Sequence, residues 1–306
     1  MASRFAIEDI QYVLGENSVP IRSSFPEYTK VIEKTGIEVV HETSKSALDL
    51  AHEALEKLLN SNPELRSEIG CIIYVSQSPV NFLPSGACLL QSRSSIGNSV
   101  MAFDIGQGCS GFVQALSVAS KMVSEFRNVV IVCSDTYRAK IEVGDRSTSV
   151  VFSDAASATW ISSREMLRVV SETHFSDGSG GKFLQQIVPA AGEVSYIKMS
   201  GADVLLFTRR VVPNEIEKAL SKASLQPKDI DYCFLHQASK LVLDGLIERF
   251  PGFKSIPVNI EKLGNTVSSS IPILMSEFKT VINESKSVLS GFGVGLSAAT
   301  LVISNH

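Results

Sequence analysis

The stretch Asp229-Ile-Asp-Tyr-Cys-Phe-Leu-His-Gln-Ala-Ser239 repeats the pattern of an earlier one, Glu68-Ile-Gly-Cys-Ile-Ile-Tyr-Val-Ser-Gln-Ser78, at an offset of 161 residues (230 − 69). Each stretch is a short apolar run that ends in polar residues, which is typical of a buried strand followed by a turn. An amphipathic helix is predicted before each of them, at residues 46–59 and 214–223. The match suggests that the chain contains two similar halves.

Two further pairs of segments repeat in the same order, and each consists of predicted strands beside a small-residue turn or a helix. In the first pair, a strand at 255–260 and a helix from about Thr266 match a strand at 100–105 and a helix at 110–123. In the second pair, residues 287–304 match residues 149–162, which are predicted as two strands joined by a turn. Repeats in one order predict a duplicated α/β fold. We place the halves at residues 1–163 and 164–306.

Three reactive side chains occur at turns of this predicted repeat. Cys109 lies where the turn Gly106-Gln-Gly-Cys-Ser-Gly111 leads into a helix, His236 follows the strand of the opening stretch, and Asn265 precedes the matching helix of the second half. If a pseudo-twofold axis relates the halves, corresponding turns face each other. The repeat therefore predicts one cleft with all three residues, at strand ends where α/β proteins bind ligands.

Each of these residues also fits a purely structural role. Cys109 is either a small residue in a crowded turn or a nucleophile. If it is a nucleophile, we expect the helix start to lower the thiol pKa from about 8.5 toward 7, which corresponds to roughly 2 kcal/mol of differential stabilisation. His236 fits a core histidine and Asn265 a helix N-cap. The segment Gly291-Phe-Gly-Val-Gly-Leu-Ser297 joins two predicted strands. It is either a tight hairpin or a loop whose N–H groups approach a substrate oxygen.

Composition excludes several classes of protein. The 306 residues are 44% hydrophobic and 20% charged, which is typical of a globular chain. A net charge of −4 without a Lys/Arg cluster argues against nucleic-acid binding. No apolar run approaches membrane-spanning length and the first residues do not resemble a signal peptide, so we expect a cytoplasmic protein without a membrane partner. Five scattered cysteines without a C-x-x-C pair predict neither a disulfide framework nor a zinc site.

A series of short motifs, taken in order, resembles beta-ketoacyl-acyl-carrier-protein synthase III and its thiolase-fold relatives over nearly the whole chain. The motifs are Lys34-Thr-Gly-Ile37, Phe82-Leu-Pro-Ser-Gly-Ala87, Phe103-Asp-Ile-Gly-Gln-Gly-Cys-Ser-Gly-Phe112, Gly144-Asp-Arg-Ser-Thr148, Leu235-His-Gln-Ala-Ser239, Leu263-Gly-Asn-Thr266 and Gly291-Phe-Gly-Val-Gly295. The resemblance implies a thiolase-like duplicated fold, layered α/β/α/β/α, and a homodimer. It also implies that Cys109, His236 and Asn265 are catalytic.

The same resemblance implies an acyltransferase with no tightly bound cofactor and no metal. An acyl group passes from acyl-CoA to Cys109, and malonyl on an acyl carrier protein then loses CO₂ and condenses with it to a 3-oxoacyl product. His236 and Asn265 are expected to stabilise the enolate oxygen. The expected N–H donors for the thioester oxygen are Cys109 and the loop of Phe292, Gly293, Val294 and Gly295. The implied pathway is the biosynthesis of fatty acids, polyketides or other specialised metabolites.

Several positions around the substrate mouth depart from the family pattern. Lys34 stands where the family often has Arg, no Trp precedes it, and Ser239 replaces the Asn after His-Gln-Ala. Lys34 and Arg146 are candidate partners for the phosphates of CoA or phosphopantetheine. The primer can thus arrive on CoA or on a carrier protein. Leu83 matches a position that reaches the partner subunit's acyl pocket, which leaves the primer length open.

Two other functions fit parts of the sequence. A non-decarboxylating acyltransferase of the same fold would pass the acyl group from Cys109 to an amine or alcohol. Cys, His and Asn also follow the chain order of a papain-like cysteine hydrolase, with an interval of 127 residues between Cys109 and His236 (236 − 109). The Gly-Cys-Ser-Gly-Phe context of Cys109 differs from that of such proteases.

Overall fold

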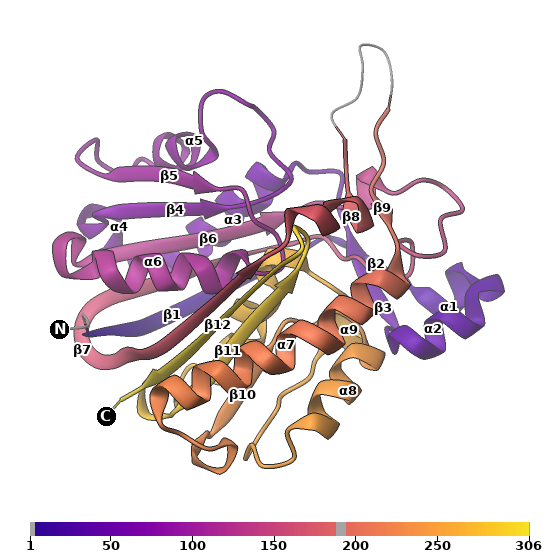
Figure 1. The fold of residues 1–306 in the computed structure, drawn as a ribbon. Coiled ribbons are helices and arrows are strands. Elements are labelled where there is room, and N and C mark those ends of the chain that lie inside the picture. Colours follow the sequence, from indigo (N-terminus) through magenta and orange to yellow (C-terminus); the bar gives the residue numbers. More distant parts are fainter. Residues whose placement is uncertain (1–3, 188–193, 306) are drawn as a thin grey trace.

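Eight strands form one continuous mixed sheet in the computed structural model, which describes residues 4–187 and 194–305 (Figure 1). The order is β10-β11-β12-β7-β6-β4-β5, and β1 pairs with β7. The eight strands are β1 (Arg4–Leu14), β4 (Cys71–Val75), β5 (Met101–Ile105), β6 (Asn128–Asp135), β7 (Ala155–Ser176), β10 (Tyr232–Leu235), β11 (Ser287–Gly293) and β12 (Ser297–Ser304). Two small two-stranded sheets are formed by β2 (Asn17–Pro20) with β3 (Val39–Glu42) and by β8 (Leu184–Gln185) with β9 (Lys198–Met199).

The α-helices cover both faces of this sheet and fill the space between its two halves (Figure 1). They are α1 (Ile21–Ser24), α2 (Thr29–Thr35), α3 (Ala47–Ser61), α4 (Leu65–Glu68), α5 (Gly86–Arg93), α6 (Gly111–Phe126), α7 (Gly201–Ala223), α8 (Lys240–Arg249), α9 (Ile260–Leu263) and α10 (Ser270–Ser276). No helix in the described ranges is long and apolar enough to cross a membrane.

One strand, β7, joins the two halves of the sheet. Its first part pairs antiparallel with β6 and β1, whereas its last part pairs with β12. The prediction of two strands within 149–162 is wrong, because the segment before β7 forms tight turns: the Asp145 carbonyl accepts from Ser149 N–H, and the Thr148 carbonyl accepts from residues 151 and 152. A single strand begins at Ala155 instead. The predicted boundary between residues 163 and 164 lies inside this strand.

The order of the strands matches the predicted repeat. In the first half β4 pairs parallel with β5 and β6, and in the second half β10 pairs parallel with β11. The other edge of β10 meets residues 254–255, where Cys233 N–H donates to the Ser255 carbonyl at 2.9 Å. The strand predicted at 255–260 does not form, because Pro257 has no N–H to continue the ladder.

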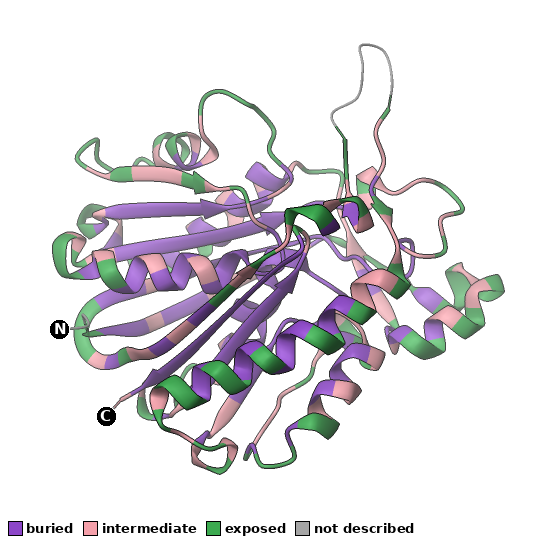
Figure 2. Cartoon of the chain, in the orientation of Figure 1, coloured by how far each residue is buried: buried purple, intermediate pink, exposed green. Residues whose placement is uncertain are grey.

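Three clusters of buried apolar side chains separate the layers. One lies between α3, α5 and the outer face of the first half, a second surrounds α6 and α10 in the middle, and a third lies beneath α7 and α8. The strands are buried along most of their length, whereas α7 is buried on one face only (Figure 2). This is the α/β/α/β/α layering expected from the sequence.

The outer helices follow the amphipathic pattern, with one exception at a proline. The helix α3 starts at a capping box in which Ser46 and Asp49 bind each other's backbone N–H groups at 3.2 Å. The helix predicted at 214–223 is only the second part of α7, which begins at Gly201 and contains Pro213 in its interior. A proline usually ends a helix, and here it concealed the first part of α7.

Candidate active site

Cys109 lies in the turn between β5 and α6, one residue before the N-cap of the helix. Cys109 is 5% exposed, and the backbone N–H groups of Val294 and of Cys109 itself lie near enough to favour the thiolate. Burial, with a smaller contribution from the buried carboxylate of Asp135, raises the pKa of the thiol to about 12. The expected lowering toward 7 is therefore wrong for the unliganded site, since burial outweighs the helix start.

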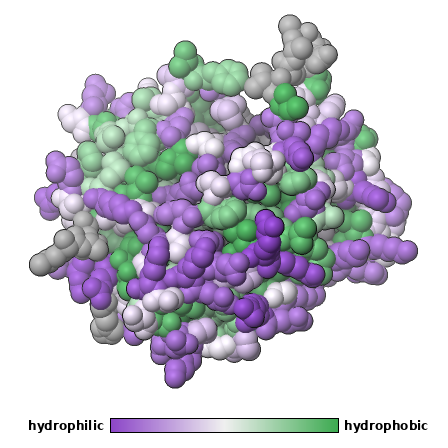
Figure 3. All heavy atoms as spheres, viewed as in Figure 1, coloured by the Kyte–Doolittle hydropathy of each residue, from purple (hydrophilic) through white to green (hydrophobic). Residues whose placement is uncertain are grey.

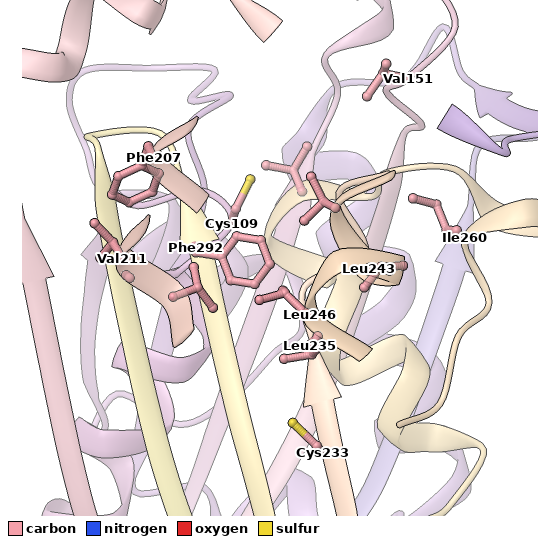
Figure 4. Close-up of a cluster of buried hydrophobic side chains, with 14 of the residues drawn as sticks. Cys109, Val151, Phe207, Val211, Cys233, Leu235, Leu243, Leu246, Ile260 and Phe292 are labelled. Carbon is pink, nitrogen blue, oxygen red and sulfur yellow. The ribbon is translucent and has the colours of Figure 1, made fainter. Parts of the chain in front are cut away.

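The loop after β11 approaches Cys109 so closely that only glycine fits at one position. A Cβ on Gly293 would lie 2.9 Å from the Cβ of Cys109 and 3.0 Å from its Sγ, and the φ of Gly293 is +156°. The ring of Phe292 lies beside Cys109, whose sulfur points away from it (Figure 4). Residues 291–297 form a tight hairpin in which Gly293 pairs with Ser297, so the hairpin interpretation is confirmed. That the N–H groups of this hairpin bind a substrate oxygen stays a prediction.

His236 follows β10 directly and is 1% exposed. Its backbone N–H donates to the carbonyl of Ser290 at 3.0 Å, and its ring meets that of Phe292 edge to face with centroids 5.5 Å apart. The side-chain Nδ1 is buried without a hydrogen-bond partner. Burial lowers the pKa of His236 to about 3, so the imidazole is neutral at physiological pH.

Asn265 lies between α9 and α10 and is 5% exposed. Its backbone N–H donates to Val151 and its carbonyl accepts from Ser153, both at 2.9 Å. The side-chain Oδ1 accepts the N–H of Val267 at 2.9 Å. Because the amide oxygen is used in this way, the Nδ2 amino group is the donor that Asn265 can offer to a ligand. The N-cap alternative is thus partly correct, since the oxygen does cap the turn before α10.

All three side chains line one cavity of about 380 Å³, as the repeat predicted. Most of its wall is apolar and comes from the start of α7, the start of α8 and Phe292. The cavity also reaches Lys34 on α2, Arg146 and Ser239, of which the first two are exposed at the mouth. We call this cavity the tunnel. Its lining includes both the exposed cations and the buried thiol.

Other predicted site residues lie apart from this tunnel. Val294 lines a second cavity on the far side of the loop, and neither cavity includes Gly295 among its described lining residues. Leu83 is 87% exposed in the segment before α5 and lines neither of them. No group of three or more His, Cys, Asp or Glu side chains within 4–187 and 194–305 is arranged to bind a metal ion. All five cysteines are free thiols.

Sequence reasoning missed two contributors to the site. The first turns of α7 supply Ala202, Leu205 and Thr208 to the tunnel wall, but Pro213 concealed this part of the helix. Gln77 and Tyr137 line the second cavity, and nothing in their local sequence marks them. The apolar spacing of Val204, Phe207 and Val211 is the signal that identifies the start of α7.

Comparison with known proteins agrees with this arrangement. Two family models match the chain, 3-oxoacyl-[acyl-carrier-protein (ACP)] synthase III at residues 103–186 and its C-terminal counterpart at 220–304. The beta-ketoacyl-[acyl-carrier-protein] synthase III of Streptococcus pneumoniae (strain Hungary19A-6) is 32% identical over 291 residues, which cover 89% of each chain.

Solved structures of this kind match almost the whole fold. A crystal structure of 3-oxoacyl-(acyl-carrier-protein) synthase III superposes with a TM-score of 0.89 at 29% identity, covering 99% of this chain and 100% of that one. The beta-ketoacyl-[acyl-carrier-protein] synthase III of Thermus thermophilus superposes with a TM-score of 0.87 at 27% identity, covering 98% of both chains.

The layered duplicated fold and the tunnel with its buried cysteine define a thiolase-like condensing enzyme. Within that class, the chain belongs to the beta-ketoacyl-[acyl-carrier-protein] synthase III family and is a synthase III-like acyltransferase. The papain-like alternative is wrong, because the chain has the thiolase-like fold instead.

Proposed function

We propose that this enzyme loads an acyl group from a thioester onto Cys109 and condenses it with malonyl on an acyl carrier protein, releasing CO₂ and a 3-oxoacyl product. One observation carries the proposal: two neutral hydrogen-bond donors, His236 and Asn265, line the same buried tunnel as the cysteine. Simple acyl transfer needs a nucleophile and an oxyanion hole, whereas decarboxylation needs additional donors for an enolate oxygen.

In the first half-reaction, the bond between Cys109 Sγ and the acyl carbon forms while the thioester bond of the donor breaks. The thiol proton leaves with the departing thiol of the donor. Negative charge develops on the acyl oxygen, and we expect the backbone N–H groups of Cys109 and of residues 292–295 to donate to that oxygen. Donors preset in this way stabilise the transition state without reorganisation.

In the second half-reaction, malonyl loses its carboxylate as CO₂, and the electron pair of the broken C–C bond forms an enolate. The neutral ring of His236 and the Nδ2 of Asn265 donate to the enolate oxygen. The enolate carbon then attacks the acyl carbonyl, the C–Sγ bond breaks, and Cys109 leaves as a thiolate that takes a proton from water. A buried apolar tunnel favours loss of CO₂, because it desolvates the malonyl carboxylate.

The mouth of the tunnel supports a substrate that carries phosphate. Lys34 and Arg146 line the mouth and are exposed there, so each can pair with a phosphate of CoA or of a carrier-bound phosphopantetheine. The apolar wall between them and Cys109 suits the uncharged pantetheine arm. We propose acyl-CoA or acyl-carrier protein as the primer donor, malonyl-carrier protein as the second substrate, and no bound cofactor.

We further propose that the enzyme is a homodimer. The strand β5 is the free edge of the large sheet, with Met101 47% exposed, and the segment between β4 and α5 exposes Phe82 and Leu83. Hydrophobic atoms appear on this side of the surface (Figure 3). An unpaired edge beside apolar side chains fits a second copy of the chain, with Leu83 directed to the partner. The pathway and the cytoplasmic location stay predictions from the sequence.

Intact-mass spectrometry after incubation with acyl-CoA and acyl-carrier donors tests the first half-reaction. We expect one acyl group on the wild-type enzyme and none on Cys109→Ala, because the Cys109 thiol is the proposed acceptor. The matched control is Cys88→Ser, which changes the exposed cysteine of α5 and should keep full labelling. Labelling of Cys109→Ala to the wild-type extent would contradict the assignment.

A further inference from the structure

A second cavity of about 290 Å³ lies on the other side of the loop that approaches Cys109. We call it the side chamber. Leu184 lines both the tunnel and the side chamber, and the adjacent loop residues Gly293 and Val294 line one each. The turn of the nucleophile contributes to both cavities, because Gly106 lines the side chamber and Cys109 lines the tunnel.

The proposed reaction needs such a chamber. The pantetheine arm of the acyl donor occupies the tunnel in the first half-reaction, and the arm of malonyl-carrier protein occupies it in the second. The acyl group on Cys109 must therefore leave the tunnel between the two steps. The side chamber adjoins the tunnel through Leu184 and includes Gly106 of the Cys109 turn and Val294 of the facing loop, so an acyl group that moves into it would meet this lining.

The side chamber is lined by hydrogen-bonding groups where an acyl chain would enter. A Cβ on Gly108 would lie 2.5 Å from Oε1 of Gln77, so this amide touches the residue next to the nucleophile. The hydroxyl of Tyr137 donates to the same Oε1 at 3.2 Å. The Tyr137 ring is fixed by an edge contact with Phe152, a tunnel residue, at 5.1 Å between centroids.

This pair has unused hydrogen-bonding capacity. The Nε2 of Gln77 makes only a long contact of 3.4 Å with the Gly106 carbonyl among its described partners. The Tyr137 oxygen donates its proton to Gln77 and keeps its lone pairs for an incoming donor. The backbone of Gln77 is anchored, since its N–H donates to buried Asp135 at 2.8 Å. The pair thus offers one donor and one acceptor from fixed positions.

We propose that the acyl group carried by Cys109 bears an uncharged oxygen substituent, a hydroxyl or a keto group, which Gln77 and Tyr137 recognise in the side chamber. This inference rests on the proposed function. An unsubstituted alkyl chain would shield the pair from solvent and leave Gln77 Nε2 with only its long contact to Gly106, which disfavours binding. A carboxylate or ammonium group would also be disfavoured, because none of the described lining residues is charged.

Acylation rates with matched donors test the proposal. The probes are pantetheine thioesters of butyrate, 2-hydroxybutyrate, 3-hydroxybutyrate, 3-oxobutyrate and succinate, and intact mass follows labelling of Cys109 over time. We expect at least one of the hydroxy or oxo donors to react at least about tenfold faster than butyryl, and succinyl to react more slowly than that donor. If butyryl reacts as fast as every oxygenated donor, the inference is wrong.

Two variants assign any preference to the pair. Gln77→Leu and Tyr137→Phe should each reduce the preference to about threefold or less, chiefly by slowing the oxygenated donor. Gln11→Leu, at a half-buried glutamine of β1 that also makes a side-chain hydrogen bond, is the control and should keep the full preference. A ratio of two rates does not depend on the fraction of folded enzyme. A preference that survives both variants would overturn the assignment, whereas no labelling by any thioester would overturn the proposed function itself.

Discussion

The strands β4 and β10 correspond in the sequence repeat of the two halves, yet the residues that follow them line different cavities. Gln77 follows β4 and lines the side chamber, whereas His236 follows β10 and lines the tunnel. Buried polar groups fix both turns: Gln77 N–H donates to Asp135 and Gln237 N–H to the hydroxyl of Ser270, each at 2.8 Å. Each half thus contributes an anchored turn after a strand, and under the two proposals above the turn after β4 meets the acyl group and the turn after β10 meets malonyl.

The largest expected effect comes from removing the donors on the β10 side. His236→Ala and Asn265→Ala should each lower the rate of condensation by about 10²-fold to 10³-fold, because each removes a donor to the enolate oxygen. Self-acylation of Cys109 should change by no more than about threefold, since its oxyanion is stabilised by backbone N–H groups. Single-turnover measurements of acylation and condensation separate the two steps.

A matched variant distinguishes chemistry from packing in this test. His236→Asn retains a neutral donor in a smaller side chain and should recover part of the condensation rate that His236→Ala loses. If acylation and condensation fall by the same factor in His236→Ala and Asn265→Ala, these residues support the cysteine rather than the enolate. The contrast between the two turns would then be lost.

The repeat pattern of the sequence predicted this arrangement at the level of topology. Matching turns placed Cys109, His236 and Asn265 in one cleft, since residues at corresponding strand ends converge whenever two halves pack about a twofold axis. The start of α7 was missed, and a strand at 255–260 was wrongly predicted, because Pro213 and Pro257 act differently in their tertiary settings. The proline of α7 is buried inside a helix, and that of 255–260 ends the pairing with the β10 segment after two backbone hydrogen bonds.

The side chamber could not be predicted from the sequence. Gln77, Gly108 and Tyr137 are far apart in the chain, and only the folded backbone brings Gln77 so close to Gly108 that a Cβ there would lie 2.5 Å from its Oε1. The thiol pKa was mispredicted for a similar reason. A local turn shows the helix start after Cys109, whereas its burial beneath the loop of residues 291–297 depends on the other half of the molecule.

A smaller effect is expected from crowding the nucleophile that both turns share. Gly293→Ala places a methyl group within 3.0 Å of the Cys109 sulfur at a backbone conformation that disfavours side chains. We expect acylation to slow by about 10-fold to 100-fold, because displaced loop N–H groups no longer match the oxyanion. The rate of mass labelling measures it. Unchanged labelling would mean that the loop does not position the reacting atoms.

Gly181→Ala is the control for this loop variant. A Cβ at Gly181 would lie 3.4 Å from the carbonyl oxygen of Gly295, an ordinary contact that should leave the acylation rate unchanged.

The smallest expected effect is that the His236 ring does not titrate near neutral pH. The folded pKa of His236 is about 3, so the imidazole should stay neutral from about pH 8 to about pH 4.5, and its ring resonances should not shift over that range. In the unfolded chain the same group takes up a proton near pH 6.5, so its burial costs stability progressively below that pH. NMR of the histidine rings, assigned with His236→Asn, checks this. An apparent pKa of 6 to 7 would show that the ring is solvated.

The central claim is that the donors around Cys109 serve decarboxylative condensation. Its most direct test follows acylated enzyme in a single turnover with malonyl-carrier protein labelled at the free carboxylate, measuring released CO₂ and 3-oxoacyl product together. We predict one CO₂ and one 3-oxoacyl product for each acyl group lost from Cys109, and almost neither with His236→Ala. Transfer of the acyl group to an amine or alcohol without release of CO₂ would contradict the account and favour the non-decarboxylating acyltransferase.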